Sequence, residues 1–256
     1  MRSLFTLLLL SLCGSALAAV SPAAESAREA ARAYGAAVRA CDMAWAVDEM
    51  YPPLRRTYAD KLGSRKAGSE SQNAKRIMGL TKETPEEARK RQDANDKALR
   101  AQYQKMGKDL KAKGVNIESY TVGTPYAEYV VTPPLGTVKA VRKDTKADVR
   151  PEDISSGNDR CRIVVLPTTL VVSAPGNDGK TQRSERRHYI FAVRDEVIND
   201  SATTGGGNAT VSRTRGTKLN KWYFIDGNTD VNTLRTYFPD LPLNIKLPPS
   251  GDRVLR

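Results

Sequence analysis

The spacing of apolar residues changes its period at Gly114, and this change limits the folds open to the chain. Before Gly114 apolar residues recur at helical spacing, as at Leu99, Tyr103, Met106 and Leu110. After it, short segments rich in β-branched and aromatic residues are typical of strands. Helices followed by strands predict an α+β fold, in which N-terminal helices pack on one face of a curved, mainly antiparallel β-sheet.

Three helices are expected before Gly114. The first covers 24–41, where one apolar stripe is formed by Ala27, Ala31, Tyr34, Val38 and Cys41. Asp42 caps a second, short helix that carries Met43, Val47 and Met50 and stops at Pro52-Pro53. The third opens with the capping-box pattern Thr84-Pro85-Glu86-Glu87, and Gly114 ends it.

Six strands are expected after Gly114, over 115–122, 129–132, 138–141, 163–172, 189–193 and 221–225. Pro167 cannot donate a backbone hydrogen bond, so it predicts an edge or a bulge at that point. Flexible inserts are expected near 63–82, 142–159 and 199–218, and a polar connection at 174–185, because these stretches are polar or glycine-rich. No internal repeat is present.

The first residues are typical of a secretory signal peptide. Met1-Arg2-Ser3 precedes an apolar run too short to span a bilayer, and Ala16 and Ala18 stand in the small-residue positions of a cleavage site. Cleavage after Ala18 predicts a leader of 1–18 and a single domain of 19–256, with a net charge of +11, exported to the periplasm or beyond. A lipid anchor on Cys13 is disfavoured because Leu12 precedes it. No later segment has the length of a membrane span.

Export decides how the other two cysteines are interpreted. In an oxidising compartment Cys41 and Cys161 could form a disulfide that closes a long loop. They could equally be two buried free thiols, because cysteine packs well as a small apolar residue.

Several local strings resemble the nuclear transport factor 2-like (NTF2-like) superfamily, and in particular small secreted bacterial members that are largely uncharacterised. These strings are Asp42-Met43, Met50-Tyr51-Pro52-Pro53, Val165-Leu166-Pro167-Thr168-Thr169-Leu170, Trp222-Tyr223-Phe224-Ile225-Asp226-Gly227, Phe238-Pro239 and Leu247-Pro248. The resemblance implies a cystatin- or NTF2-like cone, in which a long curved sheet wraps around helices and leaves a pocket at its mouth. Such folds include isomerases, polyketide-cyclase relatives, non-catalytic binders and dimers formed through the sheet, so the fold alone does not choose a function.

Eight residues are candidates for lining that pocket. They are Tyr34, Asp42, Trp45, Met50, Tyr51, Trp222, Phe224 and Asp226. An isomerase of this fold would need an aspartate near the pocket as a base, together with a tyrosine or a protonated acid. The alternative is structural: Asp42 caps a helix, Asp226-Gly227 makes a turn, and the aromatic residues fill the core.

Composition excludes several kinds of chemistry. One histidine, His188, and three cysteines supply no recognisable zinc-site spacing and no catalytic relay, so no metal or cofactor is expected. Residues 205–207 are three glycines without a following Lys-Ser/Thr, which does not match a phosphate-binding loop.

The basic excess is concentrated in 61–113, which has 15 Lys and Arg against seven acids, and in a smaller group at Arg183, Arg186 and Arg187. Such a surface attracts anionic polymers of the envelope, but no aromatic residues alternate with the charges, so no specific nucleic-acid binding is predicted. The alternative is an ordinary solvated helix, partly paired as Glu87–Arg91 and Asp93–Lys97.

The sequence therefore favours an exported, non-enzymatic binding or accessory protein that uses a pocket or sheet face for a small ligand, a protein partner or a second copy. One alternative is a cofactor-free isomerase or cyclase that uses an aspartate and tyrosines. Another is a basic envelope protein that holds anionic polymers.

Overall fold

The computed structural model describes residues 20–66, 84–131, 159–176, 178–197, 217–218 and 220–255. The elements, in chain order, are α1 (Pro22–Arg39), α2 (Met43–Asp48), α3 (Pro52–Lys66), α5 (Pro85–Ala112), β1 (Asn116–Val122), β2 (Ala127–Val131), β3 (Asp159–Pro175), β4 (Thr181–Val197), β5 (Trp222–Asp226), α7 (Val231–Tyr237) and β6 (Gly251–Leu255). The leader 1–18 with Cys13, the strand expected at 138–141, the glycines at 205–207 and most of the three inserts lie outside the described residues.

The helix boundaries follow the capping residues. Asp42 accepts a hydrogen bond from the backbone of Trp45 and begins α2, and Thr84 and Glu87 form the predicted capping box at the start of α5. Gly114, with a φ of +71°, follows the C-terminus of α5. Pro52 differs from expectation because it not only ends the preceding segment but also opens α3, a position where its missing amide hydrogen costs nothing.

The sheet is antiparallel and is built around one long hairpin, β3–β4. β1 and β2 pair with successive parts of β3, while β5 and β6 pair with successive parts of β4. Pro167 lies in β3 between the residues paired with β1 and those paired with β2, and its carbonyl accepts from Gly123. The expected bulge is absent, because the β3–β4 register runs through Pro167 without a shift, and the other side of β3 changes its partner there from β2 to β1.

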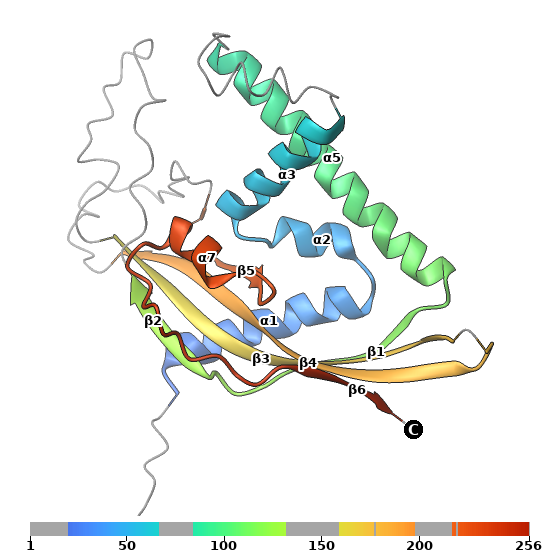
Figure 1. Cartoon of the computed structure of the whole chain (residues 1–256). Helices are drawn as coiled ribbons and strands as arrows, with labels where there is room; N and C mark the ends of the chain where they lie inside the picture. Colours follow the sequence, from blue (N-terminus) through green and yellow to red (C-terminus); the bar gives the residue numbers. More distant parts are fainter. Residues whose placement is uncertain are drawn as a thin grey trace, which may run out of the picture.

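Both faces of the sheet are covered, which corrects the expectation that helices cover one face. α1 lies on one face, where Ala27 and Ala31 pack on Val164 and Ala192 (Figure 1). The opposite face is covered by α7, the chain that follows it and the start of α3. The physical reason is that adjacent residues in β3, β4 and β5 are all apolar, so each strand has an apolar side for each layer.

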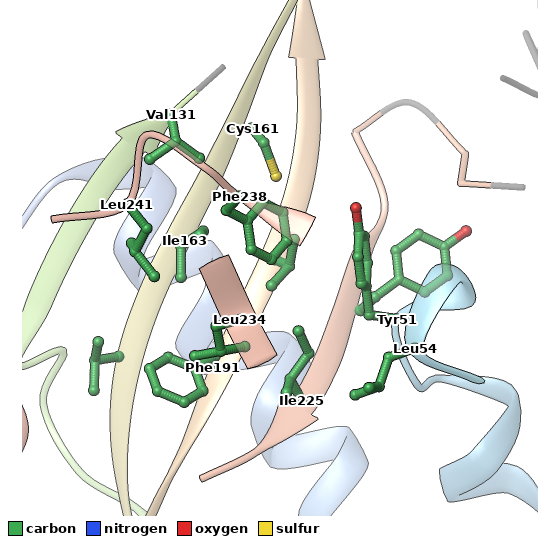
Figure 2. Close-up of a cluster of buried hydrophobic side chains, with 13 residues drawn as sticks. Tyr51, Leu54, Val131, Cys161, Ile163, Phe191, Ile225, Leu234, Phe238 and Leu241 are labelled. Carbon is green, nitrogen blue, oxygen red and sulfur yellow. The ribbon is translucent and has the colours of Figure 1, made fainter. Parts of the chain in front are cut away.

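The larger core cluster lies on the face opposite α1. Figure 2 shows side chains from α7 and the chain after it, Leu234, Phe238 and Leu241, lying over β3 and β4. All three are at most 2% exposed. The tail of the chain is thus part of the core and leads on to β6.

α5 departs most from the predicted packing. It packs against α2 and α3 and extends away from the sheet with α3, rather than lying in the concave side (Figure 1). Leu99 and Gly107 are its buried residues among those described. We call α3 and α5 together the helical arm. The expectation that every segment before Gly114 packs on the sheet is therefore wrong for α5 and for α3 beyond its start.

A partly buried charge network fixes the start of α1 to the sheet. Arg162 donates to both carboxylate oxygens of Glu196 at 2.8 and 2.9 Å, and it also contacts Glu128. Glu128 accepts from the Ser21 hydroxyl at 2.6 Å, and Arg194 contacts Glu196. Burial opposes ionisation of Glu196, but its hydrogen bonds from the two arginines prevail and lower its pKa.

Candidate functional site

Three of the candidate aromatic residues come together beside α1. The ring of Tyr34 lies 4.7 Å from that of Phe224 and 6.5 Å from that of Trp45, measured between centroids. Burial, reinforced by the nearby Asp226 carboxylate, raises the pKa of Tyr34 well above its usual range. Its hydroxyl therefore stays protonated at neutral pH.

Tyr51 belongs to the opposite face, although the backbone connects it to the same strand. Its amide donates to the carbonyl of Phe224 at 3.0 Å, and Met50 forms a parallel bridge with Phe224. The Tyr51 ring, however, packs against Phe238 at 5.3 Å and Tyr237 at 6.2 Å. The eight candidates consequently do not surround one common space.

Trp222 has a structural role on the α1 face. Its indole nitrogen donates to the Ser26 hydroxyl at 3.1 Å, and the Arg194 guanidinium lies 4.4 Å from its ring centroid. With 6% exposure it joins α1 to β5.

The two candidate aspartates both lie at the surface. Asp42 accepts from the amide of Trp45 at 3.1 Å as a helix cap, and Asp226 accepts from the amide of Asn228 at 2.7 Å in a turn. The Asp226 side chain is 62% exposed. A general base of the isomerase type needs a carboxylate kept in an apolar pocket, and neither aspartate has that environment.

The register of β4 against β5 brings His188 close to Asp226, a pair that the spacing of these residues in the sequence did not reveal. Ile190 pairs with Asp226, which brings the His188 Nε2 to 3.4 Å from an Asp226 carboxylate oxygen. That nitrogen is buried without a hydrogen-bond partner. Tyr120 lies on the sheet face that α1 covers. Burial and the nearby Tyr34 raise its pKa, while a hydrogen bond with Thr168 partly offsets the shift.

The two cysteines are free and unbridged, so the disulfide alternative is corrected. Cys41 follows the end of α1 in a left-handed conformation, with φ of +54°, and its carbonyl faces Gly107 of α5. Cys161 is fully buried in the larger core cluster beside Val131. The thiols are held in different layers, one at the α1–α2 corner and one within the sheet.

Two open grooves on the described surface involve α5. One, of about 390 Å³, separates the α1–α2 corner from α5 and includes Cys41 and Asp42. The other, of about 420 Å³, is lined only by α5 residues: Gln102, Tyr103, Lys105, Met106, Asp109, Leu110 and Lys113. None of the other seven candidates lines either groove.

The helix charges are arranged differently from the predicted pairs. Arg91 pairs with Asp60 of α3 rather than with Glu87, which is used in the capping box. Within α5, Glu86–Lys90 and Lys105–Asp109 form ion pairs.

Among the described residues, no group of histidine, cysteine and carboxylate side chains is arranged to hold a metal ion. In the same part of the chain, none of the helices combines the length and hydropathy of a membrane span. Comparisons of the chain with protein-family models, with curated proteins and with solved structures found no match.

Proposed function

We propose that this chain is an exported, non-enzymatic binding protein that recognises a protein partner through its helical arm. The observation that carries the proposal is the position of α5, a helix of 28 residues whose buried positions, among those described, are Leu99 and Gly107. Most helices in proteins owe their stability to burial of an apolar face, yet α5 contributes little to the core. A long, well-capped helix held outside the core suits recognition better than structural support.

The NTF2-like family remains part of this proposal. Support comes from the order of elements, helices before strands, and from α1 lying on a curved antiparallel sheet (Figure 1). In such a cone the small-ligand pocket would lie near Tyr34, Trp45 and Phe224. An experimental structure with a ligand-sized cavity beside these rings would favour a small ligand over a protein partner.

The non-enzymatic part can be tested through Asp226. Asparagine keeps the oxygen that accepts from Asn228 but cannot act as a base, so Asp226→Asn should fold normally. We expect wild type and variant to give the same background rate of double-bond migration in a β,γ-unsaturated ketone. A wild-type rate that falls by about 100-fold or more in Asp226→Asn would instead support the isomerase.

Export is tested by the mature N-terminus. Expressed with its leader in a secreting bacterium, the chain should lose residues 1–18, and mass spectrometry of the periplasmic fraction should find Ala19 first. An intact Met1 in that fraction, or retention in the cytoplasm, would contradict the export step.

A second candidate function, binding of anionic envelope polymers, is favoured by one further observation. Lys97, Lys108, Lys111 and Lys113 have no carboxylate partner among the described residues. Binding by charge alone should weaken steeply between about 0.05 and 0.2 M salt, and heparin is a suitable probe. Binding of a protein partner that persists through this range would favour the first function.

A further inference from the structure

The apolar stripe of α5 extends beyond the part that the protein covers. Leu99 is 3% exposed and packs with Val47 and Ala59, and Tyr103 is partly buried against the same cluster. One and two turns further on, Met106 is 41% exposed and Leu110 is half-buried. The stripe therefore begins inside the arm and ends in solvent.

The open end of the stripe forms the groove of about 420 Å³ described above. Tyr103, Met106 and Leu110 supply its apolar surface, and its polar lining residues are Gln102, Lys105, Asp109 and Lys113. A groove with an apolar floor at i, i+3 and i+7 spacing matches the apolar side chains of another amphipathic helix.

The charge of the last turns of α5 indicates what kind of helix the groove fits. Residues 97–113 contain six Lys and Arg and one acid, a net charge of +5. Arg100 is paired with Asp48 and Lys105 with Asp109, and Lys108 and Lys111 line the other groove, so among the described residues Lys113 is the unpaired lysine of this groove. A second copy would oppose two segments of +5 in a chain of net charge +12, so the electrostatics favour an acidic partner.

We propose that the last three turns of α5 bind an acidic amphipathic helix of a partner protein, with its apolar residues in the Met106 groove and its carboxylates facing Lys113. This inference rests on the proposed binding function and names the chemistry of the partner. A bilayer surface is less suitable, because helices that insert in a membrane interface present large apolar side chains outward, whereas Tyr103 and Leu110 are recessed here.

The test uses the mature chain and a synthetic acidic helix of about 18 residues, five turns long, with leucines at i, i+3, i+4 and i+7 and glutamates elsewhere. Its control is a scrambled peptide of the same composition without that period. Met106→Glu places a charge in the groove, and Ala101→Glu makes the same charge change at an exposed position of α5 outside it. Both sites are exposed, so both variants should keep the wild-type melting temperature.

We expect saturable binding of the patterned peptide at about 0.15 M salt, measured by fluorescence anisotropy. Met106→Glu should weaken it by about tenfold or more, Ala101→Glu by about threefold or less, and the scrambled peptide should bind much more weakly.

Three results would overturn the inference. Equal weakening by the two variants would place the peptide elsewhere, which leaves the binding function standing. Equal binding of the scrambled peptide would show that charge alone, and not the apolar pattern, drives peptide binding. Tight binding only to phosphatidylglycerol vesicles would identify a membrane surface as the ligand. If the patterned peptide, heparin and vesicles all failed to bind, both the inference and the proposed binding function would lose their support.

Discussion

Replacing Gly35 with alanine tests how α1 is seated on the sheet. Gly35 is buried in the last two turns of α1, inside the helix, where a glycine would ordinarily weaken it. A Cβ atom added there would lie 2.2 Å from Cδ1 and 2.7 Å from Cε1 of the Tyr120 ring in β1. The ring therefore occupies the space that a side chain would need.

Two opposing effects set the size of the change. Alanine at a helix position is favoured over glycine by about 1 kcal/mol. Overpacking a filled site costs about 1–3 kcal/mol, and the upper end applies here because Tyr120 is fixed by its pairing with Leu170 and packs within the α1-face core. The net expectation is a loss of about 2 kcal/mol, which for a domain of this size lowers the melting temperature by about 4–8 °C.

The assay is thermal and urea unfolding followed by circular dichroism. Ala36→Gly, at the exposed neighbouring position, is the matched control and should cost about 1 kcal/mol through helix propensity alone. In a Tyr120→Leu background the clash is relieved, so Gly35→Ala should become neutral or stabilising. If Gly35→Ala raises the melting temperature of the wild-type chain, α1 does not lie against Tyr120 and the packing argument fails.

Three further predictions follow from the same structure. Gly107→Ala would bring a Cβ to 2.3 Å from the Cys41 carbonyl oxygen, so α5 must shift. Amide hydrogen exchange should therefore accelerate over 97–113 but not in the sheet, and unchanged exchange would contradict this contact. Glu196 has a lowered pKa in the folded state, so its contribution to stability is present above about pH 4 and is lost as the pH falls through the folded pKa. Glu196→Gln should therefore make the free energy of unfolding fall less steeply at acid pH. An unchanged acid dependence would refute the charge network around Arg162. Cys41 and Cys161 should both react with a thiol reagent after unfolding without reductant, whereas a mass lower by two hydrogens would reveal a disulfide.

Features set by a few neighbouring residues could be predicted from the sequence. The capping box at Thr84, the cap at Asp42 and the helix end at Gly114 depend on local backbone chemistry, which the residues themselves determine. The α+β order also follows from the period change. Strand ends were less predictable, because the β3–β4 ladder continues through Ala174 and Pro175 once a tight turn joins the two strands.

Features that depend on register or on the choice of partner could not be predicted. His188 and Asp226 meet only because of how β4 and β5 align. The apolar run around Val164 lacks alternation because both of its faces are buried, but the run does not show which segment supplies the second covering layer. The stripe from Leu99 to Leu110 did carry a signal, because its helical spacing is visible in the sequence, although the sequence does not show which part of it stays uncovered.

The covering of the sheet also bears on where a partner can bind. Near β5 the two faces are already buried by α1 and by α7 with the following chain. At the far end of the hairpin, Glu118 is paired with Arg183, and Glu185 with Arg187 and Arg253. A dimer formed over that face would have to desolvate these ion pairs, which costs more than their mutual attraction returns unless new partners replace water. The groove on α5 instead exposes apolar atoms beside Lys113, where an acidic helix gains both burial and a charge pair. The helical arm is for this reason the more favourable surface for a partner.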